Sequence, residues 1–126
     1  ESTRGDVAEF VTYFSSGDRQ LLIVTRGAAE PFGLVWFDRV ANQSYALMGL
    51  WYTRHAVRDA REGTRQAMHY ALTTMGYESL RGFTPHRTAV QHVLPLGWTK
   101  VATLPRFLQI AGRLRDVYVL SYEPKE

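Results

Sequence analysis

The sequence predicts a single α+β domain with a central mixed, mostly antiparallel sheet flanked by helices. Short apolar runs bounded by glycine, proline and polar residues recur along the chain, which is typical of strands. Other segments repeat apolar residues at helical spacing, which is typical of amphipathic helices. The 126 residues and the apolar fraction of 45% fit one domain, residues 1–126, with a core of its own.

The first half of the chain predicts a helix followed by a three-stranded meander. Residues 6–14 carry apolar side chains at helical spacing, and Asp6 is a suitable N-cap, so we expect a helix there. The tetrapeptide SSGD ends that pattern. Three apolar runs follow, separated by turn-forming residues: LLIV at 21–24, LVWFDRV at 34–40 and SYALMGLWYT at 44–53. The third run is apolar on both faces, so we expect it in the centre of the sheet.

The second half predicts a helix, a strand, a second helix and two strands. The first of these helices has one apolar stripe and ends at Gly76; the stripe is Ala67, Met68, Ala71, Leu72 and Met75. A strand at 78–83 follows, and reaching it through a helix implies a parallel crossover. Thr84 and Pro85 suit the start of the second helix. Its inward residues are Ala89, Val90, Val93 and Leu94, and Pro95 ends it. Strands near 99–104 and at 117–122 complete the domain.

Composition excludes several kinds of site. The sequence has no cysteine, which excludes disulfides, thiolate nucleophiles and cysteine-bound zinc and makes the cytoplasm the expected compartment. No apolar run approaches the roughly 20 residues of a membrane helix. The net charge of +3 is too small to favour nucleic acid. The chain begins with Glu1 rather than methionine, so we expect a processed form or an excised piece. Trp36, Trp51 and Trp98 are interpreted as core residues. Tyr45, Tyr52 and Phe83 are interpreted first as packing residues, with the lining of a substrate cleft as the alternative.

The stretch RDAREGTR, residues 58–65, carries the strongest chemical signal. It follows a predicted strand and opens a predicted helix, with Gly63 and Thr64 expected in the first turn. The start of a helix offers unpaired N–H groups and the positive end of the dipole to an anion. Arg58, Arg61 and Arg65 add positive charge, although Asp59 and Glu62 offset part of it. The stretch predicts either a phosphate site or a solvated, salt-bridged helix entrance.

The order of these parts resembles the GNAT superfamily of N-acetyltransferases. RDAREG is similar to the family's R/Q-x-x-G-x-G/A turn, and TPHRTAVQHVLPLGW is similar to its N-x-x-A segment, which continues to a tyrosine and a Gly-Phe pair. GFTP and GRLRDVYVLSYE also match the family, so the resemblance spans residues 21–123. This chain departs from the pattern at three positions, where it has Arg61 for glycine, His86 for asparagine and Val93 for tyrosine. The family's first strand and helix are shortened or absent.

The resemblance implies acetyl-CoA as co-substrate and an amine as acceptor. No metal is expected, because His86 and His92 are six residues apart, which suits no common helical metal pair. The resemblance places the diphosphate of the cofactor on the arginine-rich turn and the pantetheine arm beside the third meander strand. The cofactor-binding residues are then Leu50, Trp51, Tyr52, Arg58, Arg61, Gly63, Thr64, Arg65 and His86. Asp38 and His55 are the candidate bases, and His92 is a candidate replacement for the missing tyrosine acid.

Three functions remain open from the sequence. The first is acetyl transfer to an amine of a small molecule or a protein. The second is a catalytically degenerate GNAT-fold structural or assembly protein, for example one associated with a phage virion. The third is an acetyltransferase that acts on charged tRNA, which the small net charge disfavours. An exposed edge near residues 107–110 is a candidate for pairing with a second copy in a homodimer or a larger assembly.

Overall fold

The structure is a computed structural model that describes residues 9–16, 18–25, 31–53 and 57–125. The described residues form one seven-stranded sheet with the strand order β1-β2-β3-β4-β5-β7-β6. The elements in chain order are β1 (Glu9–Ser16), β2 (Arg19–Thr25), β3 (Pro31–Arg39), β4 (Tyr45–Tyr52), α1 (Val57–Thr73), β5 (Ser79–Thr84), α2 (Arg87–Val93), a 3-10 turn (Leu94–Leu96), β6 (Thr99–Ile110) and β7 (Arg113–Tyr122). The predicted α+β class is confirmed.

The first four strands form an antiparallel meander, and the helix expected at 6–14 is wrong. Residues 9–14 belong to β1, which pairs with β2 from Glu9↔Thr25 to Ser16↔Arg19. The segment is rich in aromatic and β-branched residues, which favour strands. Its pairing with β2 outweighs the helical spacing of its apolar residues. Residues 6–8 of the expected helix lie outside the described part of the chain.

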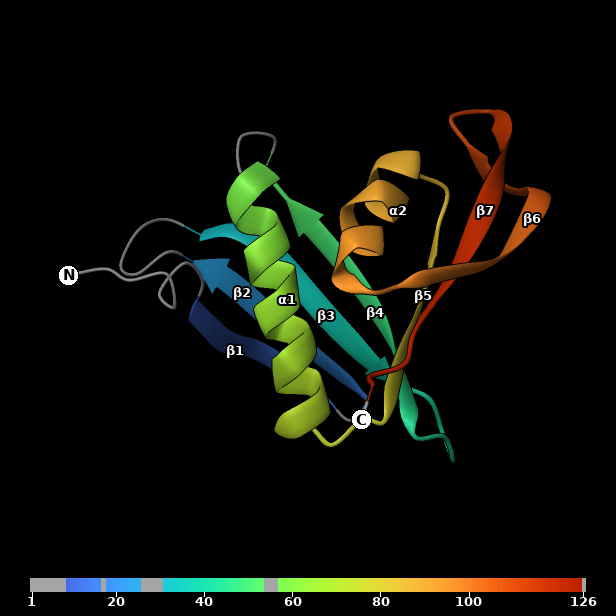
Figure 1. The fold of residues 1–126 in the computed structure, drawn as a ribbon. Helices are drawn as coiled ribbons and strands as arrows, with labels where there is room; N and C mark the ends of the chain where they lie inside the picture. Colours follow the sequence, from blue (N-terminus) through green and yellow to red (C-terminus); the bar gives the residue numbers. More distant parts are fainter. Residues whose placement is uncertain (1–8, 17, 26–30, 54–56, 126) are drawn as a thin grey trace.

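The sheet divides into two halves between β4 and β5. The crossover through α1 makes these two strands parallel, as predicted, and β4 is the central strand. They pair only from Tyr45↔Ser79 to Leu47↔Arg81. Beyond that point β4 continues to Tyr52 and β5 to Thr84, so the two strands separate toward their carboxyl ends (Figure 1). The sheet therefore has an opening at the centre of the molecule.

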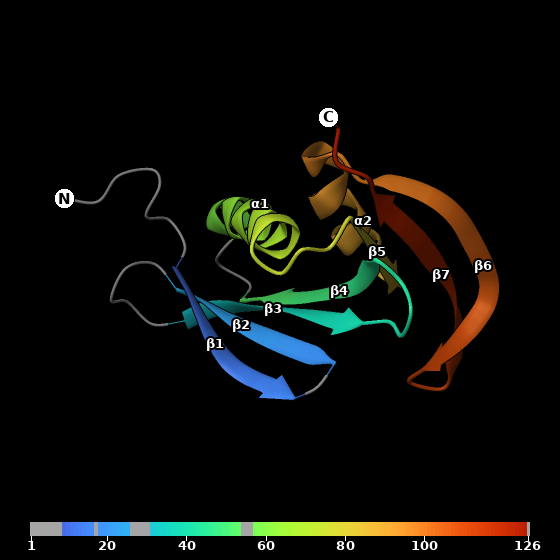
Figure 2. The ribbon, with the colours of Figure 1, turned by 90° about the horizontal axis from the view of Figure 1, so that it is seen from below.

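Both helices lie on the same face of the sheet (Figure 2). The predicted stripe of α1 is confirmed, because Ala67, Met68 and Ala71 are buried and pack in the core with apolar residues of the sheet. Those sheet residues are Leu22, Val24, Val35, Phe37, Ala46 and Leu80. Within the described residues, no helix covers the opposite face of the meander. No described helix is long and apolar enough to cross a membrane.

The second helix begins later than expected. Thr84 ends β5 instead of starting the helix, and its Oγ1 accepts the N–H of His86 at 3.0 Å. His86 is the N-cap, with extended backbone angles. Val90 and Val93 are buried as predicted. Leu94 is 44% exposed, because the chain tightens there into a 3-10 turn that rotates its side chain away from the core.

The two final strands form a hairpin that is longer than the sequence predicts. β6 and β7 meet at a two-residue turn, Ala111 and Gly112, with φ values of 52° and 78°. Such a pair matches the right-handed twist of the strands on either side. The residues RLRD, expected in a connection, belong to β7. Because β5 pairs only with residues 118–122 of β7, the tip of the hairpin extends past the end of β5 (Figure 1).

Candidate functional site

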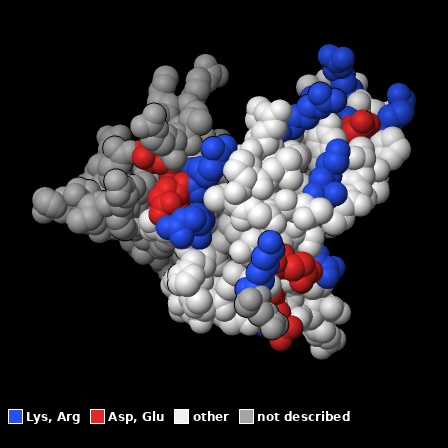
Figure 3. Space-filling model, in the orientation of Figure 1, with Lys and Arg blue, Asp and Glu red and all other residues white. Residues whose placement is uncertain are grey.

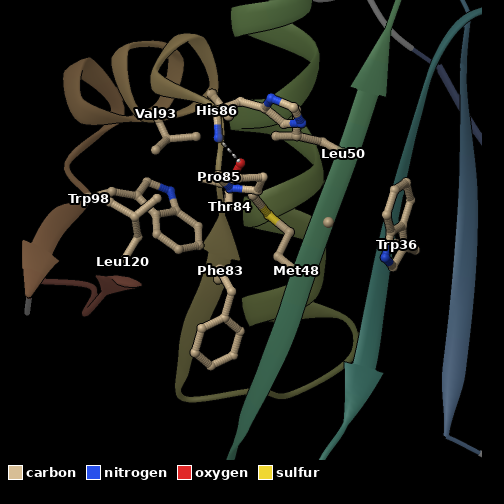
Figure 4. Close-up of a pocket in the computed structure, with 13 residues that line it drawn as sticks. Trp36, Met48, Leu50, Phe83, Thr84, Pro85, His86, Val93, Trp98 and Leu120 are labelled. Atoms are coloured by element: carbon tan, nitrogen blue, oxygen red, sulfur yellow. Dashed lines mark hydrogen bonds between the residues drawn. The ribbon is translucent and has the colours of Figure 1, made fainter. Parts of the chain in front are cut away.

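A cavity of about 260 Å³ lies where β4 and β5 separate. We call this cavity the slot. It is lined by residues of β3, β4, β5, α2 and the strands that follow: Trp36, Met48, Gly49, Leu50, Gly82, Phe83, Thr84, Pro85, His86, Ala89, Val93, Trp98 and Leu120 (Figure 4). The slot exists because the sheet opens here and α2 bridges the opening from one face.

The lining of the slot is almost entirely apolar. Trp98 is 5% exposed, and its Nε1–H donates to Sδ of Met68 at 3.3 Å, which keeps the indole in place. Val93, which the sequence resemblance matches to the tyrosine of the GNAT motif, is also buried. His86, at the mouth, is the lining residue with a titratable side chain. The slot therefore offers an apolar interior with one imidazole, that of His86, among its lining residues.

Gly49 makes room for an indole across the meander. The residue pairs with Trp36 of β3, and a Cβ built at Gly49 would lie 2.2 Å from Cε2 of Trp36. The Trp36 side chain therefore lies flat over the β4 backbone at the slot, half-buried. Trp51 is 56% exposed, so the expectation that it packs in the core is wrong. Phe83 is 58% exposed and lines the slot, which fits the cleft interpretation rather than packing. Alternation along β4 and β5 turns them to the face without a helix.

A second cluster links β4, α1 and α2 through one hydroxyl group. Thr64 is fully buried, and its Oγ1 lies 2.9 Å from the carbonyl oxygen of Ala60, 3.0 Å from the Tyr52 hydroxyl and 2.9 Å from Nε2 of His92. The rings of Tyr52 and His92 are 5.8 Å apart. We call Tyr52, Thr64 and His92 the hydroxyl cluster. It ties the end of β4 to both helices beside the slot.

Only one arrangement of protons makes all three hydrogen bonds of Thr64. The Ala60 carbonyl accepts but cannot donate, so the single hydroxyl proton of Thr64 must point to it. The Thr64 oxygen then accepts from the Tyr52 hydroxyl and from an Nε2–H of His92. His92 is therefore in the tautomer that carries its proton on Nε2.

Burial shifts the pKa values of both rings in the cluster. It raises the pKa of the Tyr52 hydroxyl to about 12, against a smaller lowering effect of the Thr64 hydrogen bond. It lowers the pKa of His92, and the nearby positive charge of Arg61 lowers it further. At neutral pH Tyr52 is thus an uncharged donor and His92 an uncharged imidazole.

The start of α1 differs from the sequence expectation. The helix begins at Val57, so Gly63 and Thr64 lie in its second turn or beyond, and the first-turn placement is wrong. Gly63 faces the sheet, where an added Cβ would lie 3.1 Å from both the Tyr52 hydroxyl and Val24 Cγ1. The corner that we expected to receive a diphosphate is filled by the protein's own side chains. The unpaired amides of the helix start belong to residues nearer Val57.

The three arginines of the motif have different settings. Arg58 lies in the first turn of α1, and its side chain is outside the described part of the structure. Arg61 is exposed, and its Nε donates to the His92 carbonyl oxygen at 3.3 Å. Arg65 forms a bidentate ion pair with Glu62, and the hydrogen bonds of Arg65 lower the pKa of Glu62. The entrance of α1 is therefore partly salt-bridged, as one of the two sequence interpretations expected.

Of the two candidate bases, Asp38 is the one within the described residues, and it does not line the slot. Asp38 lies on β3 and accepts two hydrogen bonds from Arg19, at 2.5 and 2.9 Å, and it is absent from the slot lining. His55 lies outside the described residues. His92 also does not line the slot, because its Nε2 is held by Thr64.

The structure thus groups the predicted cofactor residues unevenly. Leu50 and His86 line the slot, Tyr52, Gly63 and Thr64 pack beside it, and Trp51 faces the other side of the sheet. The sequence analysis missed Met48, Gly49 and Gly82 as lining residues. For Gly49 and Gly82 the available signal was a small residue close to Trp36 and Trp98, because an indole needs such a neighbour to lie against a strand.

The described residues hold no group of three or more histidine, aspartate or glutamate side chains arranged to bind a metal ion. No family model and no curated protein matches the sequence. Solved structures do match. A chimera of the spermidine N-acetyltransferase SpeG from Vibrio cholerae is 17% identical, with a TM-score of 0.77, over 84% of this chain and 67% of that chain. The Vibrio cholerae enzyme in complex with CoA and spermine is 16% identical, with a TM-score of 0.74, over 84% and 66% of the two chains.

These likenesses concern the path of the backbone, since the identities are low. The chain therefore has the fold of the GNAT superfamily of N-acetyltransferases.

Proposed function

We propose that the protein transfers an acetyl group from acetyl-CoA to an amine of a small molecule or a protein. The observation that carries the proposal is the apolar slot between two parallel strands that separate beside the start of a helix. The solved neighbour that contains CoA shares this fold. The slot holds the thioester end of the cofactor, and the start of α1 holds its diphosphate.

The edge of β4 supports the binding of the pantetheine arm. From Met48 to Tyr52 this strand has a partner on the β3 side but none on the β5 side. Backbone groups on an unpaired edge bind extended chains that carry amides, as an added strand would. The pantetheine arm carries two amides and fits this edge. Leu50 then contacts the arm directly, while Trp51 lies on the other face.

The diphosphate contacts the first turn of α1 rather than Gly63. Unpaired N–H groups and the helix dipole favour an anion at Val57 and the residues that follow it. Arg58 and Arg61 supply the counter-charge. This turn is supported on the side of the sheet, where α1 packs against β4 through Gly63, Thr64 and Tyr52. Arg65 contributes less, because Glu62 already neutralises it.

The chemistry is direct attack on the thioester. The amine nitrogen bonds to the carbonyl carbon, the carbon–sulfur bond breaks, and CoA leaves as a thiolate. A thiol pKa near 8.5 makes that thiolate a tolerable leaving group without the family's tyrosine. His86 accepts the proton that the attacking nitrogen loses, because it is the titratable lining residue of the slot. Asp38 and His92 are held by Arg19 and Thr64 and serve the structure.

The acceptor of the solved neighbour is not carried over to this chain. Spermine and spermidine are polycations, whose recognition requires carboxylates. None of the residues that line the slot is acidic. The proposal therefore leaves polyamines aside as acceptors.

A specific observation favours the second function, a GNAT-fold assembly protein without catalysis. The tyrosine position holds Val93, and the corner at Gly63 is filled from within. The edge strand β6 also exposes Phe107 at 65% and Leu108 at 42%, which suits pairing with another chain. The two functions differ in whether the slot binds a thioester at all.

Binding and thiol release distinguish them. Acetyl-CoA at about a hundred times its dissociation constant should stabilise the fold by about 2.7 kcal/mol, which raises the melting temperature. Ala89→Phe, which fills the mouth of the slot from α2, should abolish that rise. Gln91→Phe is the matched control, since residue 91 is exposed on the same helix and does not line the slot. An unchanged melting temperature at millimolar acetyl-CoA would leave the assembly function as the conclusion.

A further inference from the structure

A second cavity, of about 690 Å³, adjoins the slot. It lies between the start of α2 and the part of β7 that extends past β5, and we call it the groove. Arg87 borders it on the helix side, and Arg113 and Arg115 border it on the strand side. Basic side chains gather at this hairpin in the space-filling view (Figure 3). Its volume is within the usual range of small-molecule sites, about 300–1,000 Å³.

The groove carries an excess of positive charge. Its lining has three arginines and one carboxylate, that of Asp116. An Oδ1 atom of Asp116 accepts the backbone N–H of Arg106 at 2.9 Å. Within the described residues, neither Arg113 nor Arg115 forms an ion pair. Two guanidinium groups are therefore available for an anion that comes from solution.

Arg87 is held in a position that suits the same anion. Its Nε donates to the Tyr118 hydroxyl at 3.3 Å, and this bond raises the pKa of Arg87. The remaining N–H groups of the guanidinium are not used by that contact. Arginines bind carboxylate and phosphate through paired N–H groups, so three of them around one small groove select an anionic group.

The groove and the slot share two lining residues, Pro85 and His86. A small molecule in the groove therefore ends at the mouth of the slot. A ligand with an anion at one end and an amine at the other can contact the arginines and reach His86 together. This arrangement relates the groove to the second substrate rather than to the cofactor, whose diphosphate we place at α1.

We propose that the groove binds the anionic group of the acceptor, a carboxylate or a phosphate, and so selects anionic amines as substrates. This inference rests on the proposed acetyltransferase function. The anion contacts Arg113 and Arg115 with Arg87 beside them, and the amine lies at His86. An uncharged amine loses these contacts, and a polycation is repelled.

Three small amines test the selection and separate the two anions. Ethanolamine, phosphoethanolamine and β-alanine are offered with acetyl-CoA, and release of the CoA thiol gives kcat/KM for each. We expect at least one of the two anionic amines to exceed ethanolamine by about tenfold or more. Whichever of the two reacts faster identifies phosphate or carboxylate as the preferred group. Equal kcat/KM values for all three amines, or a higher kcat/KM for ethanolamine, would overturn the inference.

Variants locate the selection in the groove. Arg113→Gln together with Arg115→Gln should remove most of the preference by raising KM for the anionic amine, while the value for ethanolamine stays the same. Arg106→Gln, on the same hairpin and with the same loss of charge per residue, should keep the preference. The three positions are exposed, so urea denaturation should show folded variants. A preference that survives the double substitution contradicts the assignment to the groove.

A direct measurement separates this inference from the proposed function. Inorganic phosphate is titrated into the protein, and the backbone amide resonances are followed by NMR. Phosphate-induced shifts at residues 113–116, together with no thiol release from acetyl-CoA in the presence of any of the three amines, would support the anion site and contradict the acetyltransferase function. Binding of acetyl-CoA, together with no phosphate-induced shifts at the groove and equal kcat/KM for the three amines, would support the acetyltransferase function and contradict the anion site.

Discussion

At the scale of single residues, the Thr64 hydroxyl holds three elements together. It donates to its own helix and accepts from Tyr52 and His92, so β4 and α2 are both anchored to α1. A β-branched residue with a hydroxyl fits this buried place because its methyl group packs in the core while its oxygen serves the two rings. The sequence analysis assigned Thr64 to a phosphate site because it placed Thr64 with Gly63 in the first turn of the helix.

Removing that hydroxyl should destabilise the fold. Thr64→Val keeps the shape but leaves Tyr52 and His92 without an acceptor, which costs about 1–3 kcal/mol of unfolding free energy. In a Tyr52→Phe background the same substitution should cost less, because one of the stranded donors is already gone. Urea denaturation of the four proteins measures the coupling. Strictly additive costs would mean that the two hydroxyls do not interact.

His92 should make stability depend on pH. Its pKa is lowered in the folded state, so the unfolded chain binds the proton more tightly. The stability it contributes is complete above the unfolded value of 6.5 and is lost as the pH falls through the folded value. Glu62 acts separately, because its pKa lies below 4.5 and its contribution is lost only in more acidic solution.

We therefore expect His92→Gln to flatten the pH profile. The glutamine amide still donates to Thr64 but does not titrate, so the loss of unfolding free energy between pH 7 and pH 5 should be smaller than in the wild type. Urea denaturation at both values gives the comparison. The same loss in both proteins would show that another group causes the acid sensitivity.

At the scale of elements, the pair of β3 and β4 shapes one wall of the slot. Trp36 lies over Gly49 so closely that no Cβ fits between them. The chain there is ordinary antiparallel sheet, so the glycine is needed for space rather than for unusual backbone angles. The aromatic wall of the slot depends on this contact.

Gly49→Ala should displace the indole from that wall. We expect a loss of roughly 1–3 kcal/mol of unfolding free energy and a change in tryptophan fluorescence. In a Trp36→Ala background the substitution should be nearly neutral, because nothing then occupies the space. A Gly49→Ala protein with wild-type stability and fluorescence would show that the indole does not lie on the strand in solution.

At the scale of the whole molecule, two halves of the sheet meet at three residue pairs between β4 and β5. Core packing of α1 and α2 holds the halves together beyond that point. A ligand in the slot would add contacts to both halves at once. Binding of the ligand should therefore slow amide hydrogen exchange in β4 far more than in β1, the edge strand of the meander.

Hydrogen exchange should report this effect. The amides of Met48 to Tyr52 that face β5 have no strand partner, so they should exchange faster than those that face β3. Saturating CoA should slow the first group and leave the second little changed. Protection elsewhere, with none along β4, would place the cofactor outside the slot.

The features that the sequence predicted correctly depend on residues close together in the chain, whereas the features that it missed depend on pairing between distant segments. The stripe of α1, the central position of β4 and the crossover to β5 follow from local spacing and from chain geometry, and each is confirmed. The strand at 9–16 was missed because its pairing with β2 outweighed a helical pattern. The start of α1 was placed a turn or more too late, which moved the expected anion site to Gly63.

By itself, the sequence determined which segments form most of the strands and helices, because those depend on neighbours along the chain. It also determined the parallel crossover from β4 through α1 to β5, because that depends on chain geometry and backbone sterics. Tertiary structure alone decided that β4 and β5 separate after Leu47, that Thr64 faces His92 and that the arginines of β7 lie beside His86. These are contacts between residues far apart in the sequence. They arise only when the packing of the whole sheet sets the distances.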